Sequence, residues 1–489
     1  MVAPQLFLSI VYNSQPGGHW TKAYPFIRLH QASCSYGVNS LPLSNIRDGY
    51  GNELFSVHDL ATGKEVVEYY AAVVDQFRAC GRVQLYFNCE YSKDESGNHI
   101  VTNIHTEEVT KVYCKKIVRV HSNLVVPSMR NKAPFPIDSN VNFVPINDLP
   151  IRVASKQYKK YVIIGAGKTA SDAITYLLRN GGVDQSAITW IISRDVWFVI
   201  RDGLWESYET YRRDTVNLVN PLVECNTLHE AFLQFEKNGA VGRIDTTILP
   251  EVFKGPIIDK SELAGLRGIQ DIVRLGRVIG ITSNEIMLER GRVPLSSPSG
   301  TTLFVDCMAD IDGTYYGSKF SEDFKIFDGN QINLGPIIVY SNVCCSSAVI
   351  AYIESTFEDD EEMRNNLLYF ARGDKYSTNI MRFFSQFYYQ NKTFKALRAY
   401  PPAMKFVLNS RTLLDAPCHH RFGMLGFLWT MFGPAQMSKK VRTFVERIES
   451  GYYSDCQDCF GCAGRTLPQP HELKIKEESM VESNYPPPK

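Results

Sequence analysis

The sequence has no excess of either charge and no apolar run long enough to span a membrane. Lysine plus arginine and aspartate plus glutamate each number 52, so the charge balance gives no reason to expect a nucleic acid or an anionic membrane as partner. The first residues (MVAPQLFLSIVY) lack the basic start of a secretory leader, and their apolar run has the length of a strand. The apolar segment 423–433 is about half as long as a bilayer of roughly 30 Å requires, so we interpret it as a buried helix.

No internal repeat of fixed period and no disulfide framework is evident either. The 12 cysteines are scattered along the chain, which is typical of free thiols in a reducing compartment and predicts a cytoplasmic protein. The composition, 44% hydrophobic and 21% charged, is that of an ordinary soluble protein. A chain of 489 residues is too long for one core, so we expect two or three domains.

The most informative stretch is YVIIGAGKTASDAITYLLRNGG, which begins at Tyr161. An apolar β-branched run predicts a strand that is buried on both faces. The next residues fit G-x-G-x-x-G/A, the turn that leads from such a strand into a helix that binds a dinucleotide. Gly165 permits the tight turn, Gly167 lets the backbone approach a pyrophosphate, and Ala170 lets the helix pack closely on the strand. The helix that starts near Lys168 then directs free N–H groups at the phosphates.

The return strand, expected at 188–192, completes a strand–helix–strand unit over 161–194. This context makes the glycine motif informative, because alone it is weak. We therefore predict that Lys168 and Thr169, at the helix start, belong to the nucleotide site together with the two glycines and Ala170. A phosphate-binding P-loop is excluded, because it needs a glycine at position 162, which is valine.

The choice between NADP and NAD rests on the end of the second strand. An acidic side chain there binds the ribose hydroxyls of NAD, and an arginine binds the 2′-phosphate of NADP. Arg194 is followed by Asp195, so both types are present, and the arginine, which comes first, favours NADP over NAD. The alternative is that these two side chains form a surface ion pair of little energetic value.

Outside this unit the patterns are less specific. Helical spacing from Thr62 to Cys80 predicts a helix with Thr62 as its N-cap and Gly81 as its stop. A connector rich in proline and asparagine covers 127–150. Helical patterns dominate 205–276 and 346–448, with strands expected at 278–282 and 303–305.

Three cysteines near the end of the chain, Cys456, Cys459 and Cys462, have the spacing of metal ligands. A tetrahedral site would need a fourth ligand, and the upstream cluster Cys418, His419 and His420 would have to be brought across a helical region. We expect unligated thiols and no metal.

A resemblance to known proteins extends over roughly the first three-quarters of the chain. It rests on PGGHW (Pro16 to Trp20), YPFIRLHQASCSYGVNSLPL (from Tyr24), ATGKEVVEYY (from Ala61), FVPINDLP (from Phe143), YVIIGAGKTASDA with ITWIISRDVW, LFVDCMAD (from Leu303) and SSAVIAYIES (from Ser346). In this order the motifs resemble the two-dinucleotide flavoproteins related to flavin-containing monooxygenases.

That resemblance implies one Rossmann unit that binds FAD and a second, inserted unit that binds NADP(H). It places Gly17, Gly18 and Trp20 beside the flavin, with Arg28, His30 and Gln31 as weaker candidates. The two glycines would let the backbone approach a flat ring, and Trp20 would stack on that ring or shield it. The alternative for Trp20 and His30 is a packing role beneath the domain core.

The sequence departs from this family in three ways. The strand at Leu6 to Tyr12 corresponds to the one after the family's first helix, so the FAD phosphate-binding turn is expected to be missing, which leaves FAD binding by this chain open. The monooxygenase fingerprint F-x-G-x-x-x-H is absent between Phe135 and Lys160. No Cys-x-x-Cys pair lies in the flavin half, which argues against a dithiol reductase.

The sequence thus predicts an α/β, Rossmann-type two-dinucleotide flavoprotein fold with a helical C-terminal extension. The expected regions are an FAD-binding-like domain without its first βα unit (1–150), an NAD(P)-binding Rossmann domain (151–300), a segment that completes the first domain (301–360), a helical region (361–450) and a flexible tail (451–489). The leading hypothesis is an oxidoreductase that passes hydride from NADPH to FAD, acting on a small molecule that the sequence does not identify. The alternatives are an inactive NAD(P)-binding remnant that serves as an interaction module, and an NADP-dependent enzyme without flavin.

Overall fold

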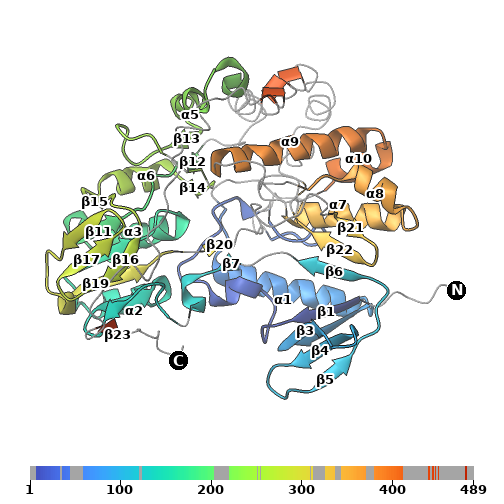
Figure 1. The fold of residues 1–489 in the computed structure, drawn as a ribbon, viewed down its shortest axis with the longest axis horizontal. Helices are drawn as coiled ribbons and strands as arrows, with labels where there is room; N and C mark the ends of the chain where they lie inside the picture. The colour runs from blue at the N-terminus through green and yellow to red at the C-terminus, as the bar shows by residue number, and fades with distance from the viewer. Residues whose placement is uncertain are drawn as a thin grey trace, which may run out of the picture. The chain divides into compact units, whose positions relative to one another are not determined.

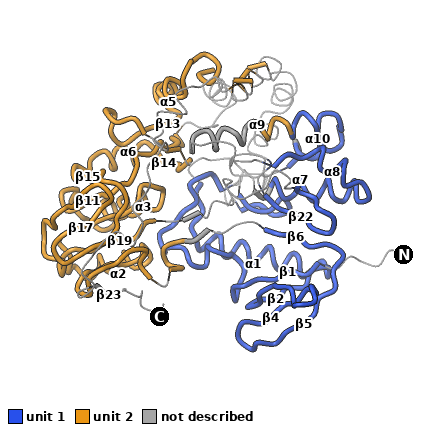
Figure 2. The backbone as a smooth tube through the Cα atoms, in the orientation of Figure 1, with its two compact units in different colours: residues 1–121, 323–370, 393–414 blue, residues 122–322, 371–392, 415–489 orange. Residues whose placement is uncertain are grey.

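The computed structural model describes residues 7–33, 36–43, 59–120, 124–130, 132–202, 220–250, 252–253, 255–308, 310–311, 325–335, 337, 343–370, 379–410, 439–440, 443–444, 446–447, 450 and 480–481. The chain divides into two compact units, shown in different colours in Figure 2. Unit 1 comprises 1–121, 323–370 and 393–414, and unit 2 comprises 122–322, 371–392 and 415–489. Each unit is described by itself.

Unit 2 is built on a five-stranded parallel sheet (Figure 1). Its strands are β9 (Asn142–Pro145), β10 (Lys160–Ile164), β11 (Ile188–Ile191), β15 (Asp271–Val273) and β19 (Thr302–Asp306). They lie in the order β15-β11-β10-β19-β9, and every neighbouring pair is parallel. From β10 the chain adds strands on one side and then returns to β19 on the other. In open α/β sheets, ligands bind beyond the carboxyl ends of the two strands that flank such a reversal, which are β10 and β19 here.

Both faces of this sheet are covered, which explains why β10 is apolar throughout. On one face lies an antiparallel meander of β16 (Val278–Ile281), β17 (Glu285–Leu288) and β18 (Gly291–Pro294). Its buried side chains share one hydrophobic cluster with those of β10, β11 and β19. The meander sheet also includes β8 (Ile137–Asp138) and β23 (Met480–Val481).

Helices cover other parts of unit 2. α3 (Lys168–Arg179) contacts β10 and also α6 (Lys260–Arg267), and α2 (Leu149–Ala154) precedes β10. A small sheet of β13 (Val241–Gly242), β12 (Phe198–Ile200) and β14 (Ile257–Ile258) lies near α5 (Leu228–Lys237) (Figure 1). A short antiparallel pair joins β7 (Leu124–Val125) to β20 (Asp310–Ile311).

Unit 1 contains two separate parallel pairings. β1 (Phe7–Val11) pairs with β2 (Val83–Phe87), and β6 (Ile117–Val120) pairs with β22 (Gln331–Leu334). β22 also pairs with β21 (Phe327–Asp328), which is antiparallel to it. An antiparallel sheet is formed by β3 (Cys89–Lys93), β4 (His99–Asn103) and β5 (Val109–Lys111).

The long helix of unit 1, α1 (Gly63–Ala79), confirms the helix that the sequence predicted. Thr62 is its N-cap: the Thr62 hydroxyl accepts from the Glu65 amide, and the Glu65 carboxylate accepts from the Thr62 amide. This reciprocal capping satisfies two amides that a helix start otherwise leaves unpaired. Gly81, just beyond the helix, has a φ of 67°, as a residue that ends a helix in the left-handed region should.

Further helices among the described residues are α7 (Val343–Thr356), α8 (Glu361–Leu367), α9 (Asn379–Arg398) and α10 (Pro401–Leu408). Apart from the first three residues of α7, they fall within 346–448, where the sequence predicted helices. The α/β fold class is therefore confirmed. The cysteine cluster at 456–462, its upstream partners at 418–420 and the apolar segment 423–433 lie outside the described residues.

Candidate nucleotide-binding site

The turn after β10 has a geometry that only glycine accommodates at its first position. Gly165 has a φ of 135°, far from the left-handed helical region near +57°. An added Cβ would lie 2.7 Å from the Cys307 carbonyl oxygen. The Gly165 amide donates to the Ile191 carbonyl (3.1 Å), and its carbonyl accepts from the Trp190 indole N–H (2.7 Å). Gly165, at the end of β10, therefore contacts residues at the ends of both neighbouring strands, β11 and β19.

Gly167 differs from Gly165, because the space beside it is open. It is exposed, its φ is −91°, and an added Cβ would meet no atom of the protein within 4 Å. It is the N-cap of α3, where no side chain caps the helix and no acidic residue lies in the first turn. Ala170 is fully buried, as close packing of helix on strand requires. The start of α3 thus presents its amides and positive dipole end to open space, the arrangement that binds anions.

Lys168 is held by carboxylates at the side of this turn. Its ammonium lies 2.6 Å from Asp172 Oδ1 and 3.1 Å from Glu262 Oε1. Burial alone would lower the pKa of Lys168, but the charges and hydrogen bonds of these two carboxylates outweigh it and raise that pKa above its usual value. Lys168 is therefore cationic and paired with both carboxylates, and its bond to Glu262 joins α3 to α6. Thr169 lies half-buried beside it.

Glu262 connects this lysine to a second cation. Arg201 is almost fully buried, and one of its guanidinium nitrogens lies 3.4 Å from Glu262 Oε2 and 3.2 Å from Asp259 Oδ2. Asp259 caps α6 and, with Glu262, forms a capping box. Two cations and three carboxylates thus form one network across α3, α6 and the end of β12. Sequence reasoning missed it, because Lys168 and Glu262 are 94 residues apart.

The acidic cap of this network makes the stability of α6 depend on pH. Burial alone would raise the pKa of Asp259, but hydrogen bonds from the Ser261 hydroxyl and the Glu262 amide lower it. The charges of Arg201 and Arg179 lower that pKa further. The folded-state pKa lies below the unfolded value, so the stabilisation is complete above about pH 4 and is lost as the pH falls further.

We expect the amides of α6 to lose protection from hydrogen exchange as the pH falls below about 4. Asp259→Asn keeps a good N-cap but cannot titrate. This variant should therefore be less protected than the wild type at pH 6 and should lose little more on acidification. An equal loss of protection on acidification in both proteins would show that another group controls this transition.

Arg194 and Asp195 are adjacent in the sequence after β11, but their side chains do not pair with each other. Asp195 pairs with Arg274, whose Nε lies 3.0 Å and 3.3 Å from the two carboxylate oxygens. Arg194 is half-buried and has no side-chain hydrogen bond or ion pair with any residue that the structure describes. The alternative interpretation, an Arg194–Asp195 surface pair, is therefore wrong, because Arg274 at the end of the neighbouring strand β15 takes the aspartate.

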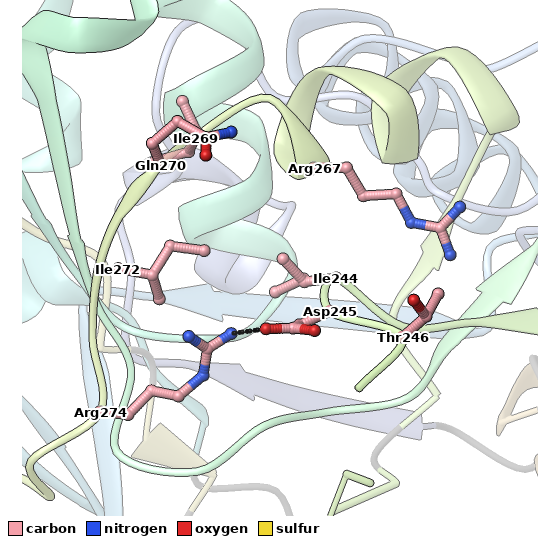
Figure 3. A pocket seen from close by; sticks show the side chains of 8 residues that line it. All are labelled: Ile244, Asp245, Thr246, Arg267, Ile269, Gln270, Ile272 and Arg274. Atoms are coloured by element: carbon pink, nitrogen blue, oxygen red, sulfur yellow. Dashed lines mark ion pairs between the residues drawn. The ribbon is translucent and has the colours of Figure 1, made fainter. Parts of the chain in front are cut away.

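A pocket of about 330 Å³ is lined by Arg274 and by Ile272 of β15, among other residues (Figure 3). Its wall includes Arg267, which donates two hydrogen bonds to the Arg243 carbonyl. Arg274 Nη2 also lies 3.8 Å from Asp245 Oδ2, the ion pair drawn in the figure. Arg274 thus forms ion pairs with two aspartates: Asp195, which follows β11, and Asp245, which follows β13.

The carboxyl end of β19 supplies a further buried pair that the sequence did not reveal. Asp306 is completely buried and accepts from Arg130 (2.9 Å) and from the Met308 amide (2.9 Å). Burial, with smaller effects of Asp306 and Asp172, raises the pKa of the neighbouring Cys307 thiol well above its usual value. Cys307 is therefore a neutral packing residue behind the turn.

The residues predicted beside a flavin lie in unit 1. Gly17 and Gly18 have φ values of 117° and 55°, and no protein atom lies within 4 Å of a Cβ built on Gly18. Gly17 is the N-cap of a short 3-10 helix, Gly18–Lys22, and Gly18 is its first residue. The Trp20 indole N–H donates to the Tyr36 hydroxyl (2.8 Å), and Arg28 donates to the Leu60 carbonyl (3.0 Å). Trp20 and Arg28 thus have structural partners, while Gly18 is open.

No group of three or more histidine, cysteine, aspartate or glutamate side chains in the described ranges is arranged to hold a metal ion. Within the same ranges, every helix is too short or too polar to cross a membrane.

Comparisons with known proteins found sequence relatives and similar solved structures. No family model matches it. Uncharacterized proteins of Mycobacterium tuberculosis and Mycobacterium bovis are 34% identical over 350 residues, which cover 71% of this chain. The chain spans 62% of the length of these curated relatives.

The solved structures to which this chain is similar include the following three. An open structure of cyclohexanone monooxygenase is 14% identical, with 81% of this chain and 93% of that chain covered and a TM-score of 0.46. Oxidized steroid monooxygenase bound to NADP is 13% identical, with 71% and 80% covered and a TM-score of 0.43. OTEMO in complex with FAD and NADP is 12% identical, with 73% and 87% covered and a TM-score of 0.40.

Proposed function

We propose that this protein is an oxidoreductase that binds NADP(H) at the start of α3 in unit 2. The observation that carries the proposal is the contrast between the two glycines of the turn. Gly165 is packed against the Cys307 backbone, while Gly167 and the uncapped amides that follow it face open space. A pyrophosphate fits such a place, because it accepts several hydrogen bonds and is attracted by the helix dipole.

Arg194 supports NADP as the nucleotide. It follows β11, the position at which Rossmann units recognise the ribose. Its guanidinium has no ion-pair partner among the described residues, so it can bind the dianionic 2′-phosphate, as a hydrogen-bond donor, without breaking an existing contact.

We further propose that the reaction partner of NADPH is a flavin, held near Gly17, Gly18 and Trp20 in unit 1. A flavin supplies the capacity to accept a hydride and pass electrons on to a second acceptor. The open backbone at Gly18 fits the approach of a flat ring, and the Tyr36 hydroxyl fixes the indole of Trp20. The start of α1 does not fit the flavin pyrophosphate, because Thr62 and Glu65 already cap it. The FAD phosphates would therefore be held elsewhere.

The nucleotide proposal is tested by Gly167→Val. The bulky side chain fits the protein but fills the space where phosphate oxygens would lie. We expect the affinity for NADP to fall about a hundredfold, the value of two charge-assisted hydrogen bonds. Isothermal titration calorimetry measures this change. Gly300→Val is the matched control, because Gly300 is also open in unit 2 but lies in the 3-10 helix before β19.

Equal NADP binding by the wild type and Gly167→Val would contradict the nucleotide site. The flavin proposal is tested separately by the visible spectrum of the purified full chain after incubation with FAD. A flavin band that NADPH bleaches would support the oxidoreductase. Protein that stays colourless but still binds NADP would leave a nucleotide-binding module without flavin chemistry.

A further inference from the structure

The end of the second strand carries an aspartate that should work against NADP. A carboxylate at this position of a Rossmann unit accepts the ribose hydroxyls of NAD and repels the 2′-phosphate of NADP. Asp195 directly follows Arg194, and its side chain is only 12% exposed. An ionised carboxylate in such a place needs a compensating charge.

Arg274 provides that charge. Its Nε lies within 3.3 Å of both oxygens of Asp195, so the carboxylate is occupied as an acceptor and neutralised. The backbone fixes this pairing: the Ile192 amide donates to the Val273 carbonyl (3.0 Å), and the Asp195 carbonyl accepts from the Val252 amide (3.3 Å).

We propose that Arg274 determines the preference for NADP over NAD by neutralising Asp195, an inference that rests on the proposed nucleotide site. Arg274 is a positioning residue, because it acts on the nucleotide through Asp195. With Arg274 paired to Asp195, the uncompensated charge after β11 is the Arg194 cation, which can bind a phosphate. Without it, Asp195 regains a free negative charge and free acceptor oxygens, which suit a ribose diol and oppose a phosphate.

The test is the ratio of the dissociation constants for NADP and NAD in Arg274→Met, measured by calorimetry. Methionine keeps the length and the apolar stem of the side chain but removes the charge. We expect NADP to bind about tenfold more weakly, as one restored repulsion near the surface would cause, while NAD binds equally well or more tightly. A change of packing alone would weaken both nucleotides alike.

Arg267→Met is the matched control, because Arg267 lines the same pocket but bonds to the Arg243 carbonyl and not to Asp195. The ratio of the NADP and NAD dissociation constants of Arg267→Met should equal that of the wild type. Asp195→Asn combined with Arg274→Met should restore NADP binding, because it removes the charge that Arg274 no longer compensates. Arg274→Lys should keep most of the wild-type preference.

Thermal unfolding shows which of these variants are folded. Should Arg274→Met fail to fold, Arg274→Lys and the double variant still test the idea, since both keep the local charge compensated and are expected to prefer NADP. An unchanged ratio in folded Arg274→Met, or a double variant that prefers NAD, would overturn the role of Arg274. Wild-type protein that binds neither nucleotide would instead overturn the proposed function.

Discussion

Gly165→Ala is expected to lower the free energy of unfolding of unit 2 by about 3 kcal/mol. Two penalties combine. A φ of 135° is a conformation that alanine strongly disfavours, and the new Cβ would lie 2.7 Å from a backbone oxygen at Cys307. That oxygen cannot move freely, because the Cys307 amide donates to the Ile164 carbonyl (3.0 Å). Separation of β10 from β19 is the way to relieve the clash.

Hydrogen exchange measured by mass spectrometry on the peptide over 160–179 reports this loss locally, so the two units need not unfold together. Gly167→Ala is the control, two residues away in the same turn. Its φ of −91° suits alanine and its surroundings are open, so its protection should match the wild type. A Gly165→Ala protein as protected as Gly167→Ala would mean that the turn is not the one described.

The strand, turn and helix at 160–179 could be predicted from the sequence because their signals are local. The apolar run of β10, the two glycines and the spacing of Ala170 and Leu177 all lie within one short segment, and each agrees with the others. The same holds for α1, where Thr62 and Glu65 cap the helix from three residues apart.

The edge strand β15 was missed for the opposite reason. β15 is only three residues long (Asp271–Val273) and follows α6 in a region whose pattern is helical. Its identity as a strand comes from parallel pairing with β11, more than 80 residues earlier in the chain. Short edge strands of this kind have too few residues for an alternating pattern to be recognised.

The charged side chains of the candidate site could be listed from the sequence but not paired. Lys168 was expected to belong to the nucleotide site, and the structure shows its ammonium between Asp172 and Glu262. Asp195 was weighed as a partner of Arg194, and it belongs to Arg274. Long charged side chains form ion pairs with residues on other elements, which only the fold brings close. Adjacency in sequence is therefore a poor guide to ion pairs.

Glu262 is the residue on which the buried charge network depends most. Its two oxygens face Lys168 and Arg201, and it also accepts from the Asp259 amide (2.8 Å) at the start of α6. Loss of Glu262 would leave each cation with one carboxylate partner in place of two, Asp172 for Lys168 and Asp259 for Arg201, in a largely buried site.

We expect Glu262→Ala to destabilise unit 2 by about 3 kcal/mol, because it removes the charge and the cap together. Glu262→Gln keeps an acceptor for the capping box, so the difference between the two variants measures the capping part. Hydrogen exchange of α3 and α6 is the readout. Arg292→Ala is the control, because the Arg292–Glu285 pair in the meander has an arginine side chain that is 68% exposed and should contribute less than about 1 kcal/mol. If Glu262→Ala were no more destabilising than Arg292→Ala, the network would hold neither helix, and Lys168 would be free to face the nucleotide.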